Sequence, residues 1–178
     1  QTAEDGTYSE RLRIASDGKV LIGDTASVTS DLLQIESPAS GGGGGIHIRR
    51  NDSNNDQQVG IVRFGNNSNA NLASIIAKTD GSVDNGKLIF KTRPSGSGIE
   101  ERMHITADGD VLIGTGTNLN VLSGTPKLQI GSGTGHASLQ FYSGTTSVNG
   151  IYFGDATAGN DRYDGYIEYQ HANRLISF

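Results

Sequence analysis

The chain has 178 residues, of which 26 are Gly, and 14 Lys and Arg against 19 Asp and Glu give a net charge of −5. Leu, Ile, Val and Phe make up 41 of the 178 residues, a share close to the level at which disorder is expected. A single copy this poor in large apolar side chains is expected to need further copies of itself to complete a core. No basic run, no apolar stretch of membrane-spanning length and no Cys is present, which argues against nucleic-acid binding, membrane insertion and disulfides.

The sequence repeats itself. The segment 10–23, ERLRIASDGKVLIG, returns at 101–114 as ERMHITADGDVLIG, an offset of 101 − 10 = 91 residues. Weaker matches follow in the same order in both copies. We therefore expect residues 1–9 to end a preceding repeat, 10–100 to form one repeat, and 101–178 to form a second, incomplete one. The chain is expected to be a window in a longer repetitive protein.

The repeated segment predicts a β-hairpin. Apolar and polar residues alternate on both sides of Asp17-Gly18, which supplies turn chemistry. A two-residue loop would scatter the large apolar side chains over both faces. A three-residue loop, 16–18, with Gly18 in the left-handed region pairs Ile14 with Val20 and gathers these side chains on one face. The predicted face comprises Leu12, Ile14, Val20, Ile22, Met103, Ile105, Val111 and Ile113, and the turns comprise Asp17, Gly18, Asp108 and Gly109.

The rest of the chain consists of short apolar runs between clusters of turn-forming residues. Each run is about five residues long, the usual length of a strand, and no stretch has a convincing helical period. The fold class is therefore expected to be all-β. The expected strands are Leu32–Ile35, Ile46–Arg49, Gly60–Phe64, Ala73–Ala77 and Lys87–Lys91, with counterparts at Lys127–Ile130, Ser138–Tyr142, Gly150–Phe153, Gly165–Gln170 and Arg174–Phe178.

Strands of this kind have open edges, and each repeat has only a thin apolar face. Both deficits are removed if several chains wrap around one axis, because each chain then supplies edge partners and core side chains to the others. Three chains would close a narrow core, whereas six or more would leave a lumen that these side chains could not fill. We expect an elongated homotrimer, either a β-prism or an intertwined β-helix.

The two Glu-Arg-(Leu/Met)-(Arg/His)-Ile-x-x-Asp-Gly-x-Val-Leu-Ile-Gly segments resemble a motif of bacteriophage tail fibres, especially those of marine and cyanobacterial phages. In that family a Thr-rich stretch, a Pro and a Leu-x-Ile strand follow, as do residues 115–117 and 126–130 here; in the first copy Asp31 replaces the Pro. The resemblance implies trimeric, extracellular fibres on the virion exterior that contact other virion proteins and attach to the host. It also implies a tip or chaperone domain after Phe178. Similar repeats occur in some bacterial surface proteins, so a cellular adhesin or filament subunit remains an alternative.

Motifs for catalysis, cofactors or metals are weak. The glycine run 41–45 lacks the Lys-Ser/Thr of a phosphate-binding loop, and the acidic loop 52–56 lacks the Gly and terminal Glu of a calcium loop. None of His47, His104, His136 and His171 belongs to a metal-binding motif, and His104 takes the place of Arg13, which indicates an exposed strand position. We expect no cofactor, no metal and no enzyme activity, although three copies of His104 around a trimer axis could gather one ion.

Four of the six Tyr fall in one segment together with several carboxylates. Aromatic rings stack on sugar faces and carboxylates bind hydroxyl groups, so this segment is the candidate for contact with a host-surface glycan. A polysaccharide-degrading tailspike, which would need two suitably spaced carboxylates from Asp155, Asp161, Asp164 and Glu168, is a further alternative. The simplest alternative is that these rings pack within the fold. The candidate glycan contacts are Tyr152, Tyr163, Tyr166 and Tyr169.

Overall fold

The computed structural model describes residues 2–4, 7–23, 26–36, 45–117, 119, 127–155, 157 and 164–178. Its regular elements are all β-strands, which confirms the all-β prediction for the described residues. The chain divides into two compact units, Gln1–Ser53 and Asn54–Phe178.

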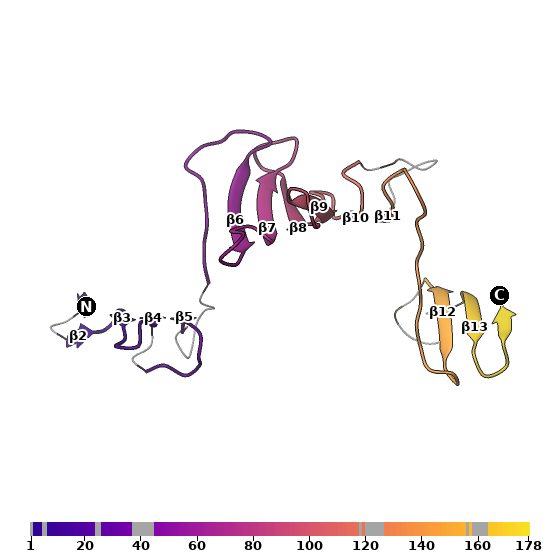
Figure 1. The fold of residues 1–178 in the computed structure, drawn as a ribbon, viewed down its shortest axis with the longest axis horizontal. Helices are drawn as coiled ribbons and strands as arrows, with labels where there is room; N and C mark the ends of the chain where they lie inside the picture. The colour runs from indigo at the N-terminus through magenta and orange to yellow at the C-terminus, as the bar shows by residue number, and fades with distance from the viewer. Residues whose placement is uncertain are drawn as a thin grey trace. The chain divides into compact units, whose positions relative to one another are not determined.

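The first unit contains two small sheets (Figure 1). Strands β1 (Thr2–Glu4) and β2 (Thr7–Ser9) form an antiparallel pair. Strands β3 (Leu12–Ile14), β4 (Val20–Ile22) and β5 (Leu33–Ile35) form the other sheet. The β3–β4 hairpin is antiparallel and β5 then joins β4 in parallel, so this sheet is a hairpin with one added strand.

The second unit contains a six-stranded and a three-stranded sheet, each in chain order (Figure 1). All neighbours are antiparallel except β10 and β11. The first three strands of the six-stranded sheet form a meander, and the last three repeat the arrangement of β3–β5. The six strands are β6 (Gln58–Phe64), β7 (Ala73–Thr79), β8 (Gly86–Thr92), β9 (Glu100–Ile105), β10 (Val111–Ile113) and β11 (Leu128–Ile130).

A second meander forms the three-stranded sheet, with β12 (Val148–Phe153), β13 (Gly165–Gln170) and β14 (Leu175–Ser177). The sequence repeat is therefore an architectural repeat: hairpin, parallel strand, three-stranded meander. In the six-stranded sheet, β8 pairs with β9 and so joins a meander to the following hairpin.

The hairpin register is the one predicted from the alternation of apolar residues. Ile14 lies opposite Val20 in the first copy, and Ile105 lies opposite Val111 in the second. The Gly18 amide donates to the Ala15 carbonyl at 2.9 Å, and Gly18 has φ +85°, the left-handed conformation that glycine adopts without strain. The Gly109 turn has the same conformation, with φ +82°.

Two of the expected strands are absent. The segments 46–49 and 138–142, expected to be a pair of equivalent strands, have no regular secondary structure. Their sequences alternate as a strand should, but a strand also needs a backbone partner. No backbone–backbone hydrogen bond joins either segment to any other described residue. The prediction is therefore wrong for the single chain.

The structure also refines the alignment of the two meanders. Phe64 lies opposite Ala73, and Phe153 lies opposite Gly165, so Phe64 and Phe153 are equivalent. A β-bulge between Gln58 and Gly60 gives the first copy one extra residue. The expected strands Gly60–Phe64 and Gly150–Phe153 aligned Gly60 with Gly150. The pairing instead makes Ile61 the equivalent of Gly150, one residue further along.

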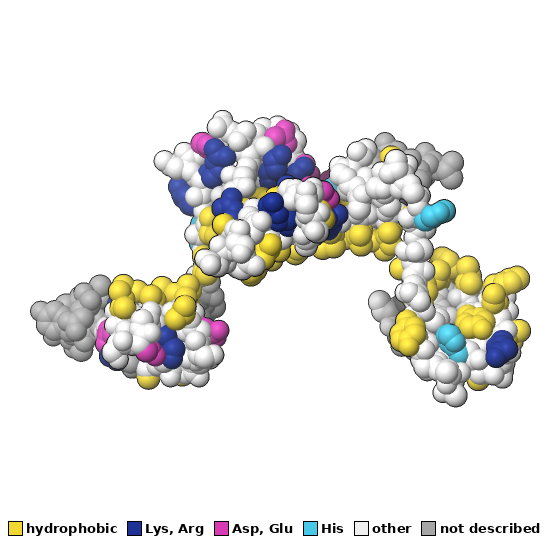
Figure 2. Space-filling model, viewed as in Figure 1, with side chains coloured by type: hydrophobic (Ala, Val, Ile, Leu, Met, Phe, Trp, Pro, Cys, Tyr) yellow, Lys and Arg dark blue, Asp and Glu magenta, His cyan; other side chains and the backbone are white. Residues whose placement is uncertain are grey.

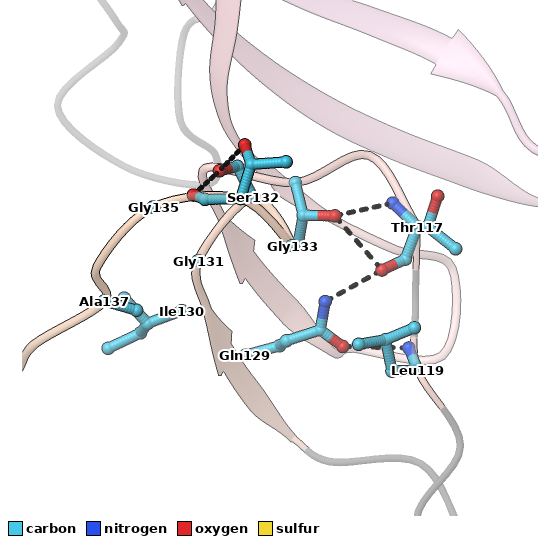
Figure 3. A pocket seen from close by; sticks show the side chains of 11 residues that line it. Thr117, Leu119, Gln129, Ile130, Gly131, Ser132, Gly133, Gly135 and Ala137 are labelled. Carbon is cyan, nitrogen blue, oxygen red and sulfur yellow. Dashed lines mark hydrogen bonds between the residues drawn. The ribbon is translucent and has the colours of Figure 1, made fainter.

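The repeated Leu-Gln-Ile strands place a glutamine where its side chain holds the preceding loop. Gln34 accepts a hydrogen bond from the Val28 amide at 3.0 Å and donates to the carbonyls of Thr29 and Asp31 at 3.2 and 2.9 Å. Gln129 accepts from the Leu119 amide and donates to the Thr117 carbonyl, both at 2.8 Å (Figure 3). The Gln129 side chain also borders a cavity of about 560 Å³ beside β11.

Gln34→Glu should destabilise the first unit because a carboxylate has the same shape but cannot donate to two carbonyls and the Ser27 hydroxyl. Gln34 is only 9% exposed, so these acceptors lose their partner in a poorly solvated site, at an expected loss of about 1–3 kcal/mol. Urea unfolding of the variant and the wild type measures the difference. An unchanged unfolding midpoint would show that the glutamine does not hold the loop.

Candidate functional site

One face of the six-stranded sheet is apolar along its whole width. Residues directly opposite one another on neighbouring strands point to the same face, so the pairing of the strands defines it. Phe90 lies opposite both Ile75 and Met103, and Met103 lies opposite Ile113. We call this set of side chains the apolar face: Val62, Phe64, Ile75, Leu88, Phe90, Met103, Ile105, Val111, Ile113, Leu128 and Ile130.

The apolar face is not the core of the single chain. Phe64 and Leu128 are 52% and 54% exposed, and every other side chain of the face is at least partly exposed. The most buried apolar residues of this sheet, Ile76, Ile89 and Leu112, lie on its opposite face. Figure 2 shows hydrophobic side chains gathered along one side of this sheet. A continuous exposed apolar surface of this kind is typical of a protein–protein contact.

The β3–β5 sheet has the same arrangement. Its apolar face comprises Leu12, Ile14, Val20, Ile22, Leu33 and Ile35. Ile14 is 73% exposed, whereas Leu21 on the opposite face is 1% exposed. In both equivalent sheets, therefore, the apolar face is exposed and the opposite face holds the buried Leu21 or Leu112.

The β12–β14 sheet has a related face. Ile151 lies opposite Ile167, and Tyr169 lies opposite both Asn149 and Ile176. These side chains border a cavity of about 340 Å³ together with Phe141 and His171, which stacks edge-on against Tyr169 with ring centres 4.8 Å apart. Asn149 connects the cavity wall to the chain before β12, because its amide donates to the Phe141 carbonyl at 2.9 Å.

The eight apolar residues predicted to share a face of the repeated hairpin lie on the apolar faces of the β3–β5 sheet and the six-stranded sheet. Each hairpin brings its own four residues together. Sequence reasoning missed the contributions of β6, β7, β8 and β11. The strand β11 and the end of β6 alternate large apolar residues with others, whereas β7 and β8 each contain consecutive large apolar residues. Their faces could therefore be assigned only once the pairing register was known.

His104 departs from its prediction. It was expected at an exposed position, but it is 5% exposed, lies on the face opposite Met103, and hydrogen-bonds Glu101 Oε1 at 2.6 Å. A side chain on that face points away from any axis lined by the apolar face. The hypothesis that three copies of His104 gather an ion there is inconsistent with this placement.

Two ion pairs lie on the opposite face, which also carries the buried Ser74 hydroxyl, a group without a hydrogen-bond partner among the described residues. Asp110 is 1% exposed and accepts a hydrogen bond from the Lys127 ammonium at 2.6 Å, which raises the pKa of Lys127 above its ordinary value. Lys87 bonds Asp80 at 2.7 Å and lowers the pKa of that carboxyl. The Asp80–Lys87 pair therefore stabilises the fold above the ordinary carboxyl pKa of 3.8 and loses this contribution as the pH falls below it.

The structure divides the predicted tyrosine patch. Tyr152 and Tyr166 lie opposite each other on one face of the β12–β14 sheet, whereas Tyr169 lies on the other face, beside the cavity. Side chains alternate along a strand, so an odd separation in sequence places Tyr166 and Tyr169 on opposite sides. Tyr163 and Asp161 lie outside the described residues.

Tyr152 is held in a defined orientation. A Cβ added at Gly150 would lie 2.6 Å from its ring atoms, so the ring lies over the glycine. Its hydroxyl donates to Glu168 Oε1 at 2.8 Å, and this carboxylate raises the pKa of the Tyr152 hydroxyl. Tyr152 is 51% exposed and Tyr166 40%, so the two residues and Glu168 form an accessible aromatic and acidic patch, the Tyr152 patch.

Within the described ranges, no group of three or more His, Asp or Glu side chains is arranged to hold a metal ion. The described residues also include no helix long and apolar enough to cross a membrane. No known family model matches the chain, and no curated protein sequence matches it significantly.

Proposed function

We propose that this chain is a structural shaft segment of a homotrimeric bacteriophage tail fibre, or of another virion fibre, which projects a host-binding tip from the particle. Its site of action is the virion exterior, and its partners are two further copies of itself and neighbouring virion proteins. The proposal combines the resemblance of the two repeated segments with the exposed apolar faces of the hairpin sheets.

The observation that supports the proposal most strongly is that the same exposed apolar face occurs in both repeats. In both copies of the hairpin with its parallel strand, the apolar face is exposed and the opposite face contains the buried leucine. At about 25 cal/mol per Å² of buried apolar surface, joining such faces is strongly favourable. A repeat that contacts its neighbours in the same way at every step produces a long, stiff object instead of a closed globule.

Such a segment acts mechanically. Backbone ladders and an apolar core shared by three chains resist bending, and they hold a tip at a fixed distance from the particle. The charged side chains of the opposite faces, including the Asp110–Lys127 and Asp80–Lys87 pairs, would then face solvent or loops.

Immunogold electron microscopy of purified phage particles tests this role, using an antibody against the folded chain. Gold at regular positions along a fibre supports the proposal. Labelling of bacterial filaments in uninfected cells instead would favour the cellular adhesin. Release of oligosaccharide from capsule or lipopolysaccharide by the purified protein would favour the tailspike.

The Tyr152 patch favours a second function, contact with a host-surface glycan. A ring held over a glycine and fixed at its hydroxyl exposes one flat face, against which the C–H bonds of a sugar can pack. Glu168 and Gln170 lie on the same face and can bond sugar hydroxyls. The patch is on the opposite side of the sheet from Ile151 and Ile167, so assembly through that apolar side leaves it accessible.

Tyr152→Ala should reduce binding of the chain to host-derived polysaccharide at least about tenfold, the effect of losing one aromatic contact. Gly150→Ala tests the orientation, because the new methyl group displaces the ring while the tyrosine remains. A glycan array or surface plasmon resonance measures both variants, with Phe178→Ala, at a highly exposed aromatic residue outside the patch, as the control. Equal binding by Tyr152→Ala and wild type would exclude the patch.

A further inference from the structure

We infer that the segments 46–49 and 138–142 are donor strands: in the assembly each pairs with the open edge of a meander in a neighbouring copy of this chain. The inference rests on the proposed self-association and specifies which backbone groups form its contacts. It follows from two sets of strand-like segments and strand edges that make no backbone ladder within the described part of the chain, and each set occurs in both repeats.

The first set belongs to the donors. Each segment alternates large apolar residues with others, as a half-buried strand does. Ile46 and Ile48 are 69% and 48% exposed, and Leu139 and Phe141 are 59% and 47% exposed. Neither segment makes a backbone–backbone hydrogen bond to the described part of the chain. The Phe141 carbonyl accepts a hydrogen bond from the Asn149 side chain, which an incoming backbone amide would have to replace. Figure 1 draws neither segment as a strand.

The second set belongs to the acceptors. β6 and β12 are the first strands of the two meanders, and among the described residues each pairs with a single neighbouring strand. They have seven and six residues, long enough to pair with a donor of four or five, whereas the edge strands β5 and β11 have only three. No proline interrupts β6 or β12, so none of their residues lacks a backbone amide donor.

The side chains match as well as the lengths. β6 presents Val62 and Phe64 on the apolar face, and β12 presents Ile151 and Phe153 on the equivalent one. A donor strand added in register places Ile46 and Ile48, or Leu139 and Phe141, beside them. Aliphatic and aromatic cross-strand pairs of this kind stabilise a sheet, and the addition extends the apolar face by one strand.

A partner copy is the occupant that the chain itself supplies. Each copy of the repeat holds one donor and one acceptor edge, so every donor has an acceptor when identical chains assemble. Pairing between chains also explains why strands predicted from sequence are absent from the isolated chain.

Disulfide trapping tests the inference directly, because the chain has no Cys of its own. Chains carrying Ile48→Cys are mixed with differently sized chains carrying Val62→Cys or Phe64→Cys, co-refolded and mildly oxidised. We expect a mixed disulfide in at least one pairing, in a yield at least about fivefold above the control. The matched control uses Ile61→Cys, whose side chain lies on the opposite face of the same strand.

Hydrogen exchange provides an independent measure. In the assembled wild type, amides of 46–49 and 138–142 should exchange about a hundredfold more slowly than in an unstructured peptide of the same sequence. Assembled chains with neither trapping nor protection would overturn the donor-strand inference and leave the fibre proposal intact. Chains that remain monomeric would overturn both.

Discussion

Replacing Ile14 by Asp should convert the assembled protein into monomers at micromolar concentration. Ile14 is 73% exposed in the single chain, so the substitution removes little that stabilises the chain on its own. In an assembly that buries the apolar face, each copy loses about 1.5–3 kcal/mol of apolar burial and gains a carboxylate that must be desolvated. Sedimentation velocity should show an increase in the dissociation constant of at least a hundredfold.

The matched control for Ile14→Asp is Val28→Asp. Val28 is 78% exposed but lies outside the strands, so the same change there should leave assembly intact. Phe64→Asp on the six-stranded sheet should dissociate the protein as well, whereas Val83→Asp, in the turn after β7, should not. Equal association by Ile14→Asp and Val28→Asp would show that the apolar face is not an interface.

Replacing Gly23 by Ala should destabilise the first unit by about 2–5 kcal/mol. Gly23 has φ +85°, where an L side chain costs about 1–2 kcal/mol. An added Cβ would also lie 2.4 Å from the Glu36 carbonyl oxygen, because the chain directly after β5 passes close to Gly23. The Glu36 amide bonds the Ile22 carbonyl at 2.9 Å, so relieving this overlap disturbs the parallel pairing, at a further cost of about 1–3 kcal/mol.

Gly18→Ala is the control that separates the two contributions. Gly18 has the same φ of +85°, but no atom lies within 4 Å of an added Cβ. Gly18→Ala should therefore lower the free energy of unfolding only by the cost of a side chain at positive φ. The effect of replacing glycine by alanine in the unfolded chain is the same for both variants and cancels in the comparison. Urea unfolding midpoints measure both. If the two variants are equally stable, the close approach of the Glu36 carbonyl to Gly23 has no energetic consequence.

The sequence was sufficient to predict the strands whose partners are local. The register of the β3–β4 hairpin followed from alternation around Asp17-Gly18, because only one loop length places Leu12, Ile14, Val20 and Ile22 on one face. The repeat at 101–114 gave the same answer for the second hairpin. Local turn chemistry and side-chain period are properties of a few neighbouring residues, and a sequence carries them directly.

The remaining features depend on distant contacts. The alternation in 46–49 predicts a strand, but it says nothing about whether a partner lies within the same chain. The bulge between Gln58 and Gly60 adds one residue to β6, so the alignment of β6 with β12 could not be set from the two sequences alone. His104 is buried although its counterpart Arg13 is exposed, and the neighbours that bury His104, on β8 and β10, could not be identified without the register.

The candidate site was predicted in part. The hairpin residues of the apolar face were identified from their spacing, whereas the tyrosine patch was grouped by closeness in sequence and divided by strand alternation into two faces. The loop-holding role of Gln34 and Gln129 was missed, because a glutamine in an apolar strand gives no indication of which backbone groups it will bond.

Light scattering coupled to size-exclusion chromatography on the unmodified chain is the most direct test of the account. We predict a species of three times the 18.7 kDa mass of one chain, stable on dilution through the micromolar range. A folded species with the mass of a single chain would contradict it, because the exposed faces of β3–β5 and β6–β11 would then need no partner.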